Sequence, residues 1–287
     1  MKYLSSFLFL ILFISIQCIT QAQSTKFVKI DTTLIGNNPS AGKYVSQRGF
    51  KMYYETYGTG KPVLLIHGNG GDISNMQYQI SYFAQQYKVI VADSRDQGKS
   101  ADPKDSISYE MMADDLNGLL DNLNLDSAYV IGWSDGGIEG LLLAMRHPDK
   151  VKKLAITGAN LWPDSTAVDP WVVSSTDGYC KSLMKETQTP GSKRQIKLVK
   201  LCVYEPNIAA KDLSKVKCPT LVIGGDHDVI LPQHTMLIAQ SIPKSYLWIV
   251  PNSGHSTLIN YRNDFNRIVG DFFVKPYRKI EREARFN

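Results

Sequence analysis

The chain has 287 residues, of which 43% are hydrophobic and 21% are charged, with 21 glycines and 13 prolines. This composition is that of an ordinary globular protein, and it excludes a disordered chain, a collagen-like repeat and a disulfide-stapled miniprotein. Lysine and arginine exceed aspartate and glutamate by 32 − 27 = 5, far less than the charge excess of a typical nucleic-acid-binding protein. The length allows one large α/β domain or two small ones.

The first 22 residues have the pattern of a cleaved export signal. Met1-Lys2 supplies a short positive start, residues 7–14 form an apolar stretch, and Thr20-Gln21-Ala22 ends in the small residue that a signal peptidase requires. We expect cleavage after Ala22 and export to the periplasm or the extracellular space. A retained membrane anchor is the weaker alternative because the apolar stretch is short for a span, and no other stretch approaches spanning length.

Export would place the cysteines in an oxidising compartment. Cys18 follows Gln17, whereas a lipid-attachment cysteine normally follows a small residue, so lipidation is weaker than cleavage. Three cysteines remain after cleavage, and an odd number leaves at least one free or bonded to another chain. A disulfide between Cys180 and Cys202 and buried free thiols, Cys218 included, both fit the sequence. No CxxC or HxxxH spacing is present, and we expect neither a metal nor a cofactor.

Residues 23–43 are polar and rich in glycine, asparagine and serine, and we expect them to form a linker. A strand is expected at residues 50–55, followed by six apolar runs of the kind that is buried on both faces of a sheet. These runs span residues 62–67, 88–93, 128–132, 153–157, 220–224 and 246–250. Helices are expected over residues 109–123 and 137–146. This alternation predicts an α/β fold with a mostly parallel central sheet flanked by helices.

One long segment interrupts the alternation. Residues 161–217 separate two buried strands by more than a plain crossover requires, and we expect them to form a small helical cap. The core would then comprise residues 44–160 and 218–274, followed by a basic tail over residues 275–287. From residue 180 to residue 217 the cap has nine Lys/Arg and three Asp/Glu, which would attract an anionic substrate or surface, or would form a solvated helical face.

Gly132-Trp133-Ser134-Asp135-Gly136 lies between a buried strand and a helix. This is the G-x-S-x-G pattern of a nucleophile elbow, in which glycines allow a turn tight enough to expose the serine hydroxyl. The turn lies above the carboxyl ends of the strands, where ligands bind in open α/β sheets. The pattern predicts that Ser134 is a nucleophile, and the alternative is an ordinary glycine turn with a surface serine.

A serine nucleophile needs a general base beside it and a carboxylate that orients the base. His255 follows the last buried strand and Asp228 follows the strand before it, so both are expected at the same edge of the sheet as Ser134. We choose Asp228 over Asp226 from its spacing to Pro232, and Asp226 remains the alternative.

His67-Gly68-Asn69-Gly70-Gly71 follows a buried strand directly. Glycines let the backbone approach a ligand closely and present N–H groups to it. We expect the backbone N–H groups of Asn69 and Asp135 to form an oxyanion hole. A phosphate-binding turn is disfavoured because neither Gly-Lys-Ser/Thr nor a GxGxxG spacing follows.

Taken in chain order, these motifs resemble those of the α/β-hydrolase superfamily, in the serine-nucleophile branch with a short helical cap. The resemblance extends over residues 44–274. It includes residues 93–100, which are similar to the family's D-x-R-G-x-G-x-S loop, with Asp96 in place of the first glycine. In that family the loop is structural. Epoxide hydrolases and haloalkane dehalogenases of this fold have an aspartate at the elbow, so Ser134 implies hydrolysis of an ester or a related acyl bond.

The resemblance implies two-step acyl transfer on a small to medium small-molecule substrate. Lactone hydrolysis, C–C bond hydrolysis and cofactor-free peroxidase or perhydrolase chemistry use the same three residues and stay open. A non-catalytic ligand-binding module of the same fold stays open as well. Trp133 and Trp162 are candidate substrate contacts, with a core aromatic as the alternative for Trp133, and the Asn69 side chain is a further candidate. We expect no nucleic-acid partner, and the oligomeric state is left open.

Overall fold

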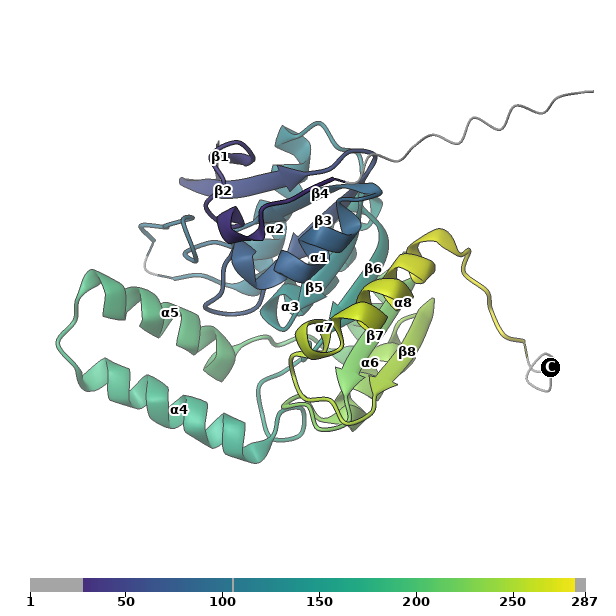
Figure 1. Cartoon of the computed structure of the whole chain (residues 1–287). Helices are drawn as coiled ribbons and strands as arrows, with labels where there is room; N and C mark the ends of the chain where they lie inside the picture. The colour runs from purple at the N-terminus through teal and green to yellow at the C-terminus, as the bar shows by residue number, and fades with distance from the viewer. Residues whose placement is uncertain (1–27, 105, 282–287) are drawn as a thin grey trace, which may run out of the picture.

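The structure is a computed structural model that describes residues 28–104 and 106–281. Its centre is an eight-stranded sheet in the order β1-β2-β4-β3-β5-β6-β7-β8 (Figure 1). The strands are β1 (Gly42–Gln47), β2 (Phe50–Tyr57), β3 (Lys61–Ile66), β4 (Tyr87–Ala92), β5 (Ala128–Trp133), β6 (Val151–Thr157), β7 (Thr220–Gly225) and β8 (Ser245–Val250). β2 pairs antiparallel with β1 and β4, and all other neighbours pair parallel. The predicted mostly parallel sheet is confirmed. The export signal predicted for residues 1–22 lies outside the described residues.

Helices cover both faces of the sheet (Figure 1). They are α1 (Gln77–Phe83), α2 (Tyr109–Asn122), α3 (Asp135–Arg146), α4 (Pro170–Lys185), α5 (Pro190–Tyr204), α6 (Pro232–Ser241), α7 (Thr257–Asn260) and α8 (Arg262–Val274). In β3, Leu64 and Ile66 pack with α2 and α3, whereas Val63 and Leu65 pack with α1 and α8. The run is apolar throughout because both of its faces are buried. Among these helices none is long and apolar enough to cross a membrane.

The segment predicted as a cap contains α4 and α5, which form a helical hairpin at the carboxyl edge of the sheet (Figure 1). Each helix has a strong start signal. The Asp169 side chain accepts hydrogen bonds at the start of α4, and Thr189 and Ser192 form a capping box at the start of α5, with a proline at the first position of each helix. On α4 only Cys180 and Leu183 are buried, so that α4 packs on α5 rather than on the sheet.

Residues 28–43 belong to the stretch expected as a linker, and they contact the core. The backbone N–H groups of Gly36 and Asn38 each donate a 2.9 Å hydrogen bond to the carboxylate of Glu55, which is fully buried in β2. The strand β1, which the sequence analysis did not predict, begins at Gly42 inside this stretch. Its alternating half-buried residues lack the continuous apolar run that marks the inner strands.

Candidate active site

Ser134 lies at the turn between β5 and α3, with a φ of 56°. Such a backbone conformation is costly for a residue with a side chain, and it occurs where the surrounding structure enforces it. The two glycines of the motif make the turn possible. A Cβ atom at Gly132 would lie 2.1 Å from the carbonyl oxygen of Gly136, and one at Gly136 would lie 2.3 Å from that of Ile66. The tight turn therefore presents the hydroxyl of Ser134 at the carboxyl edge of the sheet.

Three side chains from three separate loops form a continuous hydrogen-bonded chain. The Oγ of Ser134 lies 2.9 Å from Nε2 of His255, and Nδ1 of His255 lies 2.7 Å from Oδ1 of Asp228. The Asp228 carboxylate is buried, and the N–H of Ile230 also donates to Oδ1 at 3.1 Å. Gly158, with a φ of +67°, leaves room for the imidazole, because a Cβ there would lie 2.7 Å from Cε1 of His255. This arrangement suits proton transfer from the hydroxyl to the imidazole.

Asp226, the alternative acid, makes different contacts. Its carboxylate accepts hydrogen bonds from the backbone N–H groups of Asn252 and Ser253, at 2.9 and 3.0 Å. The Asn252 bond, together with contacts from His227 and Ser253, holds the pKa of Asp226 well below its ordinary value. Asp226 thus braces the loop that carries His255, while Asp228 contacts the imidazole.

The turn after β3 brings the predicted oxyanion-hole residues to Ser134. A Cβ at Gly68 would lie 3.2 Å from Cβ of Ser134, so the turn lies directly against the nucleophile. The N–H of Gly70 donates to Oε1 of Gln97 at 2.7 Å. The N–H of Asn69 donates no hydrogen bond within residues 28–104 and 106–281, and Asp135 is the first residue of α3, whose initial amides lack helical acceptors. Both amides are placed at the edge where an oxyanion would form.

The side chain of Asn69 connects the core to the cap. Its Nδ2 donates to Oδ2 of Asp135 at 2.7 Å and to the carbonyl oxygen of Leu198, on α5, at 3.1 Å. Both hydrogens of the amide are therefore used within the protein. We considered this side chain as a substrate contact, and the structure shows it making two contacts within the protein instead.

A cavity of about 440 Å³ opens above Ser134 and His255, between the sheet and the cap. Part of its lining is apolar, and these residues are Pro163, Val168, Val172, Val173, Val203, Val229 and Ile230. Neither Trp133 nor Trp162 lines this cavity. The indole N–H of Trp133 donates to the carbonyl oxygen of His255 at 3.0 Å, and that of Trp162 donates to Oγ1 of Thr166 at 2.8 Å. The structure places both tryptophans beside the site rather than in it.

The polar lining of the cavity is acidic, which the sequence analysis did not anticipate. It includes Asp135, Asp164, Asp177 and Glu205, and no lysine or arginine of the described residues lines it. Asp177 pairs with Lys181 at 2.6 Å, and Asp164 is exposed. Asp135 is different because its carboxylate is buried beside the nucleophile without a basic partner. The basic residues counted in the cap therefore do not set the charge of the cavity.

Burial raises the pKa of Asp135 to about 6, against the opposing effect of hydrogen bonds from Asn69 and the Tyr109 hydroxyl. Glu139, one turn further along α3, is fully buried, and burial raises its pKa well above the ordinary value. With a pKa of about 6, Asp135 is mainly ionised near neutral pH. Of the two buried carboxylates at the site, Asp228 contacts the imidazole of His255 and Asp135 lies beside the nucleophile.

The cysteines at 180, 202 and 218 are free thiols, and Cys202 lines the cavity. Burial raises the pKa of the Cys202 thiol far above its ordinary value, so it is not a thiolate nucleophile. Across the two described ranges, no group of three or more His, Cys, Asp or Glu side chains is arranged to hold a metal ion.

The geometry agrees with the relatives of this chain. A family model described as "alpha/beta hydrolase fold" matches residues 61–188. The serine hydrolase BPHL of Mus musculus is 26% identical over 257 residues, which cover 79% of this chain and 84% of that protein. The 2-hydroxymuconate semialdehyde hydrolase of Pseudomonas sp. (strain CF600) is 27% identical over 279 residues, which cover 83% and 96%.

Solved structures add the same fold. An esterase from Exiguobacterium antarcticum superposes with a TM-score of 0.73 at 22% identity, covering 82% of this chain and all of that one. The relatives include named hydrolases, and the non-catalytic module considered from the sequence is set aside. The chain belongs to the α/β-hydrolase superfamily and is a hydrolytic enzyme.

Proposed function

We propose that the protein is an exported serine hydrolase that cleaves a carboxylic ester, or a related acyl bond, of a small to medium substrate. The observation that carries this proposal is the chain of contacts from Ser134 to His255 at 2.9 Å and from His255 to Asp228 at 2.7 Å. The cavity of about 440 Å³ above these residues limits the substrate to a modest size.

In the proposed mechanism, His255 takes the hydroxyl proton of Ser134 while the oxygen attacks the carbonyl carbon of the substrate. The oxyanion that develops accepts hydrogen bonds from the amides of Asn69 and Asp135. Asp228 keeps the imidazole oriented and stabilises its protonated form. His255 then protonates the leaving group, and water repeats the sequence on the acyl-enzyme to release the acid.

We further propose that the substrate has an ammonium group close to the carbonyl carbon. Asp135 directly follows the nucleophile in the chain, and its buried carboxylate accepts hydrogen bonds from the neutral donors Asn69 and Tyr109, with no lysine or arginine among the described residues that line the cavity. Taking a carboxylate out of water is costly unless an opposite charge accompanies it. A cationic substrate would supply that charge, and the valines of the cavity lining would contact an aliphatic side chain. α-Amino acid esters combine these features.

A second candidate is hydrolysis of a C–C bond on the same three residues. It is favoured by the similarity to a relative named 2-hydroxymuconate semialdehyde hydrolase. The acidic lining of the cavity favours a cationic ester over an anionic substrate of any kind, because like charges repel in a site of low dielectric constant.

The test compares L-leucine methyl ester with methyl 4-methylpentanoate, which has the same skeleton without the amino group. At pH 7 we expect kcat/KM to be about 100-fold higher for the amino ester, because a buried charge pair typically contributes several kcal/mol. Asp135→Asn should remove this preference and leave turnover of the neutral ester within about threefold. Ser134→Ala should abolish both reactions.

Two results would decide against the proposal. Equal turnover of both esters by the wild type would remove the ammonium requirement and leave the esterase. No turnover of either ester, with Ser134 still labelled by a fluorophosphonate, would direct attention to the C–C bond alternative. Export is tested separately by N-terminal sequencing of the secreted protein, which should begin at Gln23.

A further inference from the structure

Asp96 occupies a backbone conformation that favours glycine. It lies in the loop that follows β4, its φ is 59°, and its side chain is almost fully buried. A residue with a Cβ pays a steric penalty in this left-handed region, and aspartate tolerates it better than most. The contacts of the carboxylate show what this residue does that glycine would not.

The carboxylate of Asp96 faces two basic side chains of the cap helix α5. Oδ2 lies 2.5 Å from Nζ of Lys197, and Oδ1 lies 3.7 Å from Nε of Arg194. Oδ1 also accepts a hydrogen bond from the N–H of Asp102 at 3.2 Å. The guanidinium of Arg194 donates to the carbonyl oxygens of Asp96 and Gly98 as well. Two ion pairs and their hydrogen bonds thus join α5 to this loop of the core.

The next residue of α5 is joined to the other loop of the site. Leu198 accepts the hydrogen bond from Asn69, whose amide also contacts Asp135. Four to seven residues beyond Leu198, the residues Cys202, Val203 and Glu205 line the cavity. Because a helix is stiff over this distance of roughly 10 Å, the position of Lys197 and Leu198 fixes the position of this part of the cavity lining.

The other cap helix depends on α5. α4 packs mainly against α5, and its residues Val172, Val173 and Thr176 also line the cavity. Fixing α5 therefore fixes the hairpin as a whole relative to Ser134.

We propose that Asp96 is a positioning residue that holds the cap helix α5 over the cavity through Lys197 and Arg194. It acts on substrate binding through the cap and does not touch the reacting atoms. Its effect on kinetics rests on the proposed function, whereas its effect on the cap does not.

The first experiment measures hydrogen exchange in α5 without any substrate. Asp96→Asn keeps the size and the left-handed preference but removes the charge, and Asp96→Gly also removes the strain. Both variants, and Lys197→Met, should speed exchange in residues 190–204 by about tenfold or more, since hydrogen bonds to charged groups are lost. Exchange in α8 should be unchanged. Lys193→Met is the matched control, because Lys193 makes no ion pair within the described chain.

The second experiment measures kinetics on L-leucine methyl ester. Asp96→Asn should raise KM by about tenfold, while kcat and the rate of fluorophosphonate labelling at Ser134 change less than about twofold. Combining Asp96→Asn with Lys197→Met should speed exchange by less than the product of the two single effects, because both variants remove the Asp96–Lys197 ion pair, while Lys197 also donates to the carbonyl oxygens of Asp102 and Lys104.

Unchanged exchange in α5 for both Asp96→Asn and Lys197→Met would overturn the proposal, as would an equal effect of Lys193→Met. A general loss of folding would appear in α8 as well as in α5, and that outcome would assign Asp96 to stability instead. If the wild type hydrolyses no ester, the proposed function fails, and the exchange experiment still decides the role of Asp96.

Discussion

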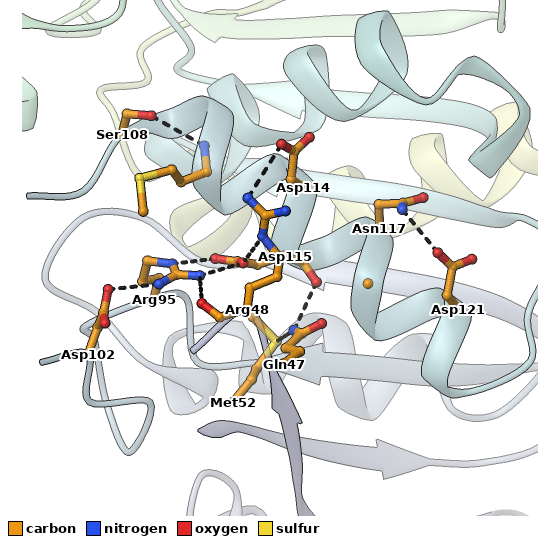
Figure 2. Close-up of polar contacts among 12 residues, drawn as sticks. Gln47, Arg48, Met52, Arg95, Asp102, Ser108, Asp114, Asp115, Asn117 and Asp121 are labelled. Atoms are coloured by element: carbon orange, nitrogen blue, oxygen red, sulfur yellow. Dashed lines mark hydrogen bonds and ion pairs between the residues drawn. The ribbon is translucent and has the colours of Figure 1, made fainter. Parts of the chain in front are cut away.

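Two groups of buried carboxylates in this protein are treated in opposite ways. Around Arg95, the side chains of Asp102 and Asp115 are fully buried, and the guanidinium reaches both, at 2.8 Å for Asp102 and 2.6 Å for Asp115 (Figure 2). Arg48 adds a second cation at 2.9 Å from Asp115, and the ring of Phe50 lies 4.0 Å from the Arg95 guanidinium. Asp135 beside the nucleophile accepts hydrogen bonds from the neutral donors Asn69 and Tyr109, and the group near it that can become a cation is the imidazole of His255.

This difference distinguishes buried charges that stabilise the fold from a buried charge that serves the function of the site. The charges around Arg95 are compensated within the fold, and their hydrogen-bonding capacity is used, so this cluster joins the loop after β4 to α2. The charge of Asp135 is left without a cation at the wall of a cavity. A fold gains nothing from such a charge on its own, and a ligand of opposite sign gives a reason to retain it.

The largest expected effect comes from removing the cation of the paired cluster. Arg95→Met would leave the buried Asp102 without a cation and Asp115 with only the exposed Arg48, and we expect a loss of about 3–5 kcal/mol in the free energy of unfolding. Urea denaturation at pH 7 measures it. Arg146→Met is the control, since Arg146 pairs with Asp114 at 2.8 Å but is 42% exposed, and should cost less than about 1 kcal/mol. Equal urea midpoints for the two variants would contradict the distinction.

At Asp135 the expected effect on stability has the opposite sign. Burial raises the pKa of this carboxyl from an ordinary 3.8 to about 6, so the folded state binds the proton more tightly than the unfolded state. Stability is therefore lost as the pH rises through this range. Asp135→Asn should be about 3 kcal/mol more stable than the wild type at pH 7.5, and the difference should vanish near pH 4. Urea midpoints at both pH values measure it, and a less stable variant at pH 7.5 would refute the argument.

The strands and turns that carry the site could be predicted from the sequence, because the patterns that indicate them lie within short segments of the chain. Continuous apolar runs identified the inner strands, and the glycines around Ser134 identified the turn that the structure contains. The carboxyl ends of neighbouring parallel strands meet at one edge, so residues after β5, β7 and β8 were expected together. β1 was missed, because an edge strand with alternating exposure has no continuous apolar run.

The charge of the site could not be predicted in the same way. Asp135 was considered for its backbone amide alone, because the burial of its side chain depends on Tyr109, Asn69 and the cap. The direction in which the basic side chains of α5 point could not be predicted from the sequence either. Lys197 and Arg194 face Asp96 rather than a substrate, and this requires the position of a helix about 100 residues away in the chain. Charge counts along a segment do not distinguish its inner from its outer face.

The smallest effect we predict concerns a neutral hydrogen bond in the same site. The indole N–H of Trp133 donates to the carbonyl oxygen of His255 at 3.0 Å, while the neighbouring Ser134 contacts the imidazole of the same residue. His255 is thus held at its backbone and at its ring by consecutive residues of β5 and the elbow. Trp133→Phe keeps an aromatic ring but removes the donor, and this leaves the backbone of His255 less fixed.

We expect Trp133→Phe to lower kcat by about fivefold with little change in KM, because a neutral hydrogen bond contributes about 1 kcal/mol. The fluorophosphonate labelling rate of Ser134 should fall by the same factor, since it depends on the same base. Trp248→Phe is the matched control, because the Trp248 indole donates no hydrogen bond in the described part of the chain. A reduced melting temperature with unchanged kcat would mean that the bond serves stability. An equal loss of kcat in both variants would mean that the volume of the indole matters rather than its hydrogen-bond donor. A fall in kcat for Trp133→Phe alone would show that the elbow acts on this site in two ways, through the buried charge of Asp135 and through the neutral hydrogen bond of Trp133.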